Sequence, residues 1–79
     1  MPLTILLAAT LRKYVAGYDA ATGHAMAIDQ GTSVRQVAAR LSVPEAEVKL
    51  IMVNGAHADW ETILTGDERL ALFPPVGGG

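Results

Sequence analysis

Cysteine is absent from the 79-residue sequence. Its absence excludes disulfides, zinc sites built on thiolates and any catalytic or sulfur-carrying thiol. A basic stripe is also lacking, because the six lysines and arginines are scattered and the formal net charge is −2. Nucleic-acid binding is therefore not expected. The apolar opening run is short and has no basic segment before it, so we expect a buried strand of a cytoplasmic protein rather than a signal peptide or membrane segment.

The small size of the chain limits what it can do alone. A domain of this length buries only about 60% of the surface that its unfolded chain exposes, and a deep active-site pocket usually needs a larger scaffold. We therefore expect a carrier or binding module, not an enzyme. His24 and His57 have no ligand-forming residue at metal spacing, and Ser33 has no neighbouring histidine. No metal site and no catalytic residue are predicted.

Strand patterns dominate the first third of the chain. The run from Leu3 to Ala9 is apolar up to Thr10 apart from Thr4, which predicts a central strand packed on both faces. Residues 12–21 contain Gly17 and show no period, so they are expected to form a loop. A weak alternation over residues 23–29 predicts a second strand.

The clearest helical pattern covers Ser33–Leu41. Its apolar residues recur at the i, i+3, i+4, i+7 spacing of a helix with one buried face, at Val34, Val37, Ala38 and Leu41. Ser33 and Gln36 fit a capping box, with Thr32 as an alternative cap, and Pro44 ends the helix.

The second half of the sequence predicts further strands and a hairpin. Asn54-Gly55 is a strong hairpin signal, because both residues tolerate positive φ. The assignments are a strand at 48–53, a return limb at 56–59, a loop at 60–65, a turn at Gly66-Asp67 and a closing strand at 68–73. With one helix among them, these elements predict an α+β domain in which a mixed sheet of four to five strands packs on one main helix.

The chain ends in Pro74-Pro75-Val76 and three glycines, Gly77, Gly78 and Gly79. The prolines fix φ, and glycine has no side chain to block entry into a narrow channel of another enzyme. There the terminal carboxylate would be converted to an acyl-adenylate, and a sulfur nucleophile would displace AMP to leave a thiocarboxylate. The alternative is an idle chain end or a remnant of protein expression.

The segment from Leu70 to Val76, running into the terminal glycines, resembles the small subunit of molybdopterin synthase. The thiamine-pathway sulfur carriers are related to it. The similarity extends to residues 9–13 and 53–55 and to the spacing of Leu64 from the tail. On these residues the sequence is identified as a member of the ThiS/MoaD-like ubiquitin-like sulfur carriers.

The resemblance implies a ubiquitin-like β-grasp domain over residues 1–73 and a projecting tail over 74–79. It implies no bound cofactor, adenylation of Gly79 by an E1-like enzyme that uses ATP, and sulfur delivery from a sulfurtransferase. Gly77 and Gly78 would insert with the tail into a larger synthase subunit, which assembles the dithiolene of the molybdenum or tungsten cofactor.

Partner contacts are predicted for Phe73, Pro74, Pro75, Val76 and Arg12. Phe73 should lie on the face opposite Leu70 and Leu72, because strand side chains alternate, although it could instead close the edge of the core. Arg12 either pairs with an acidic residue of the partner or is simply solvated. Two positions at which the family often carries bulky apolar contacts are Ala8 and His57 here.

Three departures from the family pattern keep other functions open. Gly66 comes one position earlier in the last turn than the family places its glycine, Ile63 replaces a common proline, and the residue before the final glycine pair is itself glycine. The alternatives are sulfur supply for thiamine thiazole or another metabolite, a ubiquitin-like protein modifier, and a non-covalent β-grasp interaction module.

Overall fold

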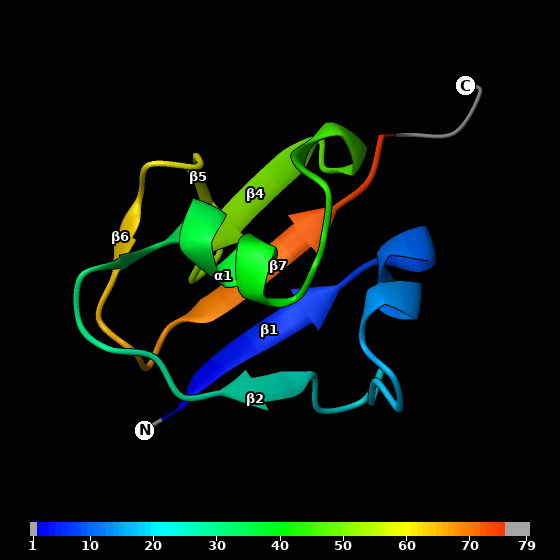
Figure 1. Cartoon of the computed structure of the whole chain (residues 1–79), viewed down its shortest axis with the longest axis horizontal. Helices are drawn as coiled ribbons and strands as arrows, with labels where there is room; N and C mark the ends of the chain where they lie inside the picture. Colours follow the sequence, from blue (N-terminus) through cyan, green and yellow to red (C-terminus); the bar gives the residue numbers. More distant parts are fainter. Residues whose placement is uncertain (1, 76–79) are drawn as a thin grey trace.

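The computed structural model describes residues 2–75. It contains a five-stranded mixed sheet in the order β2-β1-β7-β4-β5 and a two-stranded sheet, β3-β6. In Figure 1 the helix α1 lies across one face of the larger sheet. The predicted mixed sheet on one main helix is therefore confirmed. The elements are β1 (Leu3–Leu7), the 3₁₀-helix η1 (Ala9–Tyr14), β2 (His24–Met26), β3 (Thr32–Ser33), α1 (Val34–Arg40), the 3₁₀-helix η2 (Glu45–Glu47), β4 (Leu50–Val53), β5 (Ala56–Ala58), β6 (Ile63–Leu64) and β7 (Arg69–Phe73).

The centre of the larger sheet is a parallel pair, β1 with β7. In β1 the side chains of Leu3, Ile5 and Leu7 are buried, whereas Thr4 and Leu6 are only half-buried. The expected packing on both faces is thus wrong. Only the face toward α1 is closed, because one short helix cannot cover both sides of the sheet. The strand also ends at Leu7, two residues earlier than predicted.

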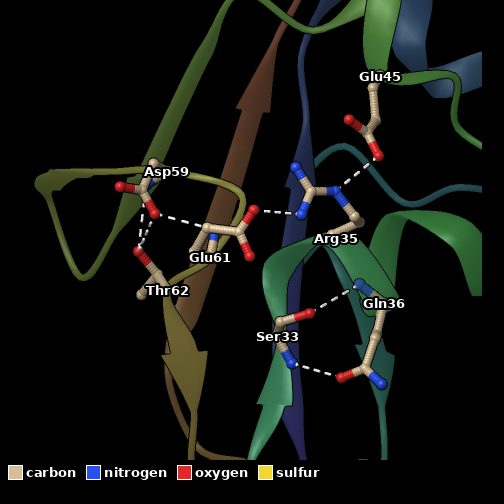
Figure 2. Close-up of polar contacts among 7 residues, drawn as sticks. All are labelled: Ser33, Arg35, Gln36, Glu45, Asp59, Glu61 and Thr62. Atoms are coloured by element: carbon tan, nitrogen blue, oxygen red, sulfur yellow. Dashed lines mark hydrogen bonds and ion pairs between the residues drawn. The ribbon is translucent and has the colours of Figure 1, made fainter.

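The helix α1 begins where the sequence predicts. Ser33 is its N-cap: the backbone N–H of Gln36 donates to the Ser33 hydroxyl at 3.2 Å, and the Ser33 N–H donates to Oε1 of Gln36 at 2.8 Å. This reciprocal pair, drawn in Figure 2, is the predicted capping box. The four predicted apolar positions are all in the buried core, Val34, Val37, Ala38 and Leu41.

Hydrogen bonds and an ion pair join the start of α1 to the segment at 59–62. The N–H groups of Val34 and Arg35 donate to the carbonyls of Thr62 and Trp60 at 3.0 and 3.1 Å. The Arg35 guanidinium lies between two carboxylates in Figure 2, pairing with Glu61 and, at 2.9 Å, with Glu45. The helix is therefore held to both segments that flank its first turn.

The hairpin is formed as predicted, by Asn54 and Gly55 with φ of 51° and 82° between β4 and β5. The assignment of residues 60–65 to a loop is wrong in part, because Ile63 and Leu64 form β6. They pair with Ser33 and Thr32 of β3. A strand of two residues is too short to show a period, so its pairing arises from tertiary contact alone.

The last turn before β7 is organised by Glu68. Its carboxylate accepts from the backbone N–H groups of Thr65 at 2.8 Å and Gly66 at 2.9 Å, and from the Thr65 hydroxyl at 3.0 Å. Partial burial of Glu68 opposes ionisation, but these hydrogen bonds outweigh it and lower its pKa to about 2. Gly66 has a φ of 128°, which explains why glycine stands at this position.

Among residues 2–75, no helix has the length and apolar character needed to cross a lipid bilayer.

Candidate functional site

The strand β7 leads directly into the predicted reactive tail. Its last two carbonyls are both bound: Leu72 accepts from the Ala8 N–H at 3.1 Å, and Phe73 accepts from the Lys49 N–H at 2.8 Å. The point at which Pro74 leaves the sheet is therefore fixed by β1 on one side and by the start of β4 on the other. In Figure 1 this end of β7 lies between β1 and β4.

Four residues of the predicted site, Val76, Gly77, Gly78 and Gly79, lie outside the described residues. Their predicted roles in tail insertion, adenylation and thiocarboxylate formation stay predictions. So does the division into a domain over 1–73 and a projecting tail. The structure describes the residues that precede this segment, which are the end of β7 and Pro74 and Pro75.

A groove surrounds the tail base. It has a volume of about 500 Å³ and is lined mainly by apolar side chains. We call it the tail-base groove; its residues are Ala8, Ala9, Lys49, Leu50, Phe73, Pro74 and Pro75. The structure thus brings together three of the predicted partner-binding residues, Phe73, Pro74 and Pro75, with side chains from two other parts of the chain.

Phe73 is half-buried, whereas Leu70 and Leu72 are fully buried toward α1. It pairs directly with Leu50 of β4, so the two side chains lie on the same face, away from the helix. This is the placement expected of a residue that faces a partner. The contact with a partner remains a prediction.

The corner after β1 is held by two side chains. The Leu7 N–H donates to the Tyr18 hydroxyl at 2.8 Å, and Nε of Arg12 donates to the Leu7 carbonyl at 3.1 Å. The Arg12 guanidinium also lies 6.0 Å from the centre of the Tyr18 ring. Ala9, with φ of 49°, turns the chain into η1, so the expected loop at 12–21 begins instead inside a 3₁₀-helix.

Arg12 is exposed and lies outside the residues that line the tail-base groove. Its bond to the Leu7 carbonyl gives it a role within the chain that the sequence did not indicate. The sequence did not indicate a role for Tyr18 either. Its hydroxyl accepts from the backbone N–H of Leu7, eleven residues away, and such a contact leaves no local pattern. Partner contact by Arg12 stays a prediction.

Lys49 and Leu50 are groove residues that the sequence analysis did not single out. Their position depends on the antiparallel register of β4 with β7, in which Leu50 opposes Phe73. The strand at 48–53 and its hairpin with the return limb at 56–59 were predicted, but its pairing with β7 was not. Of the two positions at which the family often has bulky contacts, Ala8 lines the groove and His57 lies on β5 opposite Met52.

The described residues offer no alternative metal centre. Within residues 2–75, no three histidine, cysteine, aspartate or glutamate side chains are grouped closely enough to hold an ion.

The comparisons with known proteins agree with this arrangement. The model of the ThiS family matches residues 5–79. Among solved structures, SAMP1 from Haloferax volcanii superposes with a TM-score of 0.71 over 100% of both chains at 20% sequence identity, a likeness that establishes the ubiquitin-like β-grasp fold. No curated protein gives a significant match.

Because the family model covers nearly the whole sequence, the chain belongs to the ThiS family. Membership supports a role as a sulfur carrier or ubiquitin-like modifier, and it implies an E1-like activating enzyme as a partner. Small proteins of this type are generally carriers without catalytic activity.

Proposed function

We propose that this ThiS-family protein carries sulfur on the carboxylate of Gly79. An E1-like enzyme first joins that carboxylate to the AMP part of ATP, and pyrophosphate leaves. Hydrosulfide, released when a thiol reduces the persulfide of a sulfurtransferase and becomes a disulfide, then attacks the acyl carbon. The new C–S bond replaces the C–O bond to AMP, so AMP leaves and a C-terminal thiocarboxylate remains. The domain holds no cofactor in this scheme.

The observation that carries the proposal is the family match, which runs through Gly79 in a chain that has no cysteine. With no thiol available, the terminal carboxylate is the group on which sulfur can be carried. The tail-base groove adds support, because it surrounds the start of the tail with apolar surface that a partner can cover.

Within this function the residues near the C-terminus have separate tasks. Pro74 and Pro75 fix φ where the chain leaves β7, and Phe73 contributes apolar surface beside them. Gly77 and Gly78 pass through the partner's channel because they have no side chain. Arg12 and Val76 are proposed as further contacts with the partner.

For the acceptor we propose molybdopterin synthesis, with the tail inserting into a larger synthase subunit. The support is the likeness of residues 70–76 to the molybdopterin synthase small subunit. The third glycine instead favours the thiamine-type carriers. Incubating the thiocarboxylated protein with each candidate synthase from the same genome, and assaying dithiolene or thiazole formation, separates the two pathways.

The activation step is tested by mass spectrometry. The protein is incubated with its cognate activating enzyme, ATP and a sulfur source, and an ATP-dependent exchange of one oxygen for sulfur at Gly79 is expected. The matched control is the chain without Gly78 and Gly79, which should gain no mass. If the intact chain gains no mass either, sulfur carriage is excluded. If cells function equally well with the shortened chain, a non-covalent interaction module is supported instead.

Protein modification is a second use of the same activated carboxylate, since membership of the family also fits a modifier role. In that case the acyl carbon would be transferred to a lysine amine. Immunoblots of cells that express the tagged protein would then show larger covalent adducts that depend on Gly79. Their absence would leave sulfur carriage as the function.

A further inference from the structure

The face of the sheet away from α1 carries a second groove that adjoins the first. It has a volume of about 530 Å³, and Phe73 lines both. We call it the sheet-face groove; its residues are Leu6, Met52, Asn54, Gly55, Arg69, Ala71 and Phe73. The two grooves form one apolar surface that follows β7 from its first residue to the tail base.

The ionisable groups on this surface are all cationic. Arg69 lines the sheet-face groove and Lys49 lines the tail-base groove. The chain has eight aspartates and glutamates, and none of them lines either groove. A protein with a net charge of −2 therefore presents a basic and apolar surface beside its tail.

Both cations are available to a partner. Lys49 and Arg69 are exposed, and the two ion pairs found among residues 2–75 are both made by Arg35 on the helix side. The backbone of Arg69 is held by Asn54, whose side-chain oxygen accepts from the Arg69 N–H at 2.9 Å. The backbone of Arg69 at the start of the surface is thus fixed, while its guanidinium makes no ion pair with the residues at 2–75.

The two cations lie at opposite ends of β7. Arg69 is the first residue of the strand, and the Lys49 N–H donates to the carbonyl of its last residue, Phe73. Four steps along a strand at about 3.3 Å each place these ends about 13 Å apart. Between them lie the apolar side chains of Leu6, Leu50, Met52, Ala71 and Phe73.

We propose that this surface selects a protein partner with an apolar ridge flanked by two carboxylates, one toward each end of β7, which pair with Lys49 and Arg69. The proposal rests on the proposed function, and the partner surface is that of the activating enzyme. Apolar contact supplies the affinity, while the two cations set the register along β7. They also disfavour a partner that presents cations at these places.

The test compares three charge reversals in activation by the cognate enzyme. Lys49→Glu and Arg69→Glu change the surface, and Arg40→Glu makes the same change of charge at the exposed end of α1. Pyrophosphate release is measured at low and high salt with each protein as the varied substrate. Thermal melting checks that each variant is folded. If a charge reversal prevents folding, the glutamine substitution at the same position is used in its place.

Each reversal on the surface should raise KM about fivefold at low salt and leave kcat unchanged, because the reacting carboxylate is the same. The KM of the double variant should rise about 25-fold, since sites this far apart act independently. High salt should shrink both effects because it screens the charges. Arg40→Glu should behave as the unchanged protein.

Two results would overturn the inference while leaving the proposed function intact. One is a KM for the Lys49 and Arg69 variants equal to that of Arg40→Glu, and the other is a KM increase that salt does not reduce. If the unchanged protein releases no pyrophosphate at all, the proposed function itself fails, and the inference fails with it.

Discussion

The turn at Glu68 allows a sharp test of how β7 is held in place. Replacing Glu68 with glutamine preserves the shape of the side chain and one acceptor oxygen but removes the charge. The carboxylate accepts three hydrogen bonds from Thr65 and Gly66, at 2.8 to 3.0 Å. Since these bonds favour the ionised form, the variant should unfold more easily at neutral pH.

The magnitude follows from the shift in pKa of Glu68, from 4.5 to about 2. A shift of this size corresponds to at most about 3 kcal/mol of stabilisation. Glu68 is partly exposed, so solvent screening reduces the expected loss to about 1 kcal/mol. Because the folded-state pKa is the lower one, the contribution is fully present above about pH 5 and is lost as the pH falls toward about 2.

Urea denaturation of the unchanged protein and of Glu68→Gln, followed from pH 7 to pH 3, tests this reasoning. The difference in unfolding free energy should be about 1 kcal/mol at pH 7 and should shrink steadily below about pH 5. Asp29→Asn removes one carboxylate elsewhere and is the control for net charge. A difference that stays constant across the pH range would refute the role assigned to the charge.

Two further predictions concern α1. Ser33→Ala should lower the unfolding free energy by about 1 kcal/mol and the midpoint of thermal melting by about 4–8 °C, because it removes the oxygen that caps the Gln36 N–H. Gln36→Ala removes the other half of the capping box and should also lower the unfolding free energy. Equal melting of both single variants and the unchanged protein would contradict the cap. Arg35→Gln should cost less than about 1 kcal/mol, because both ion pairs are exposed. Denaturation in high salt should nearly abolish that cost, and a cost that persists there would assign the effect to packing.

The sequence predicted the elements whose information is local. Ser33 and Gln36 are three residues apart and form the capping box that they indicate. Asn54 and Gly55 adopt the positive φ values that a tight hairpin needs. In both cases the residues that determine the structure are neighbours in the chain, so a pattern in the sequence is enough to find them.

The features that escaped prediction depend on distant residues. Leu64 belongs to a two-residue strand that exists only because Thr32 lies opposite it. Leu6 is as apolar as its buried neighbours, and only the placement of α1 decides that it faces a groove. In the candidate site, Phe73 was found from its place beside the tail, but Lys49 enters only through the register of β4 with β7.

The parallel pairing of β1 with β7 links the groove beside the tail to the completion of folding. Thr4 pairs with Arg69 and Leu7 with Leu72, so the central contact of the sheet joins segments that are far apart in sequence. Contacts of this kind close a long loop of chain and slow the folding step that forms them. The tail-base groove is lined by residues that follow β1, precede β4 and end β7, so it exists only once these segments are paired. A partly folded chain therefore lacks the tail-base groove. An activating enzyme that recognises the groove would adenylate only molecules that have finished folding.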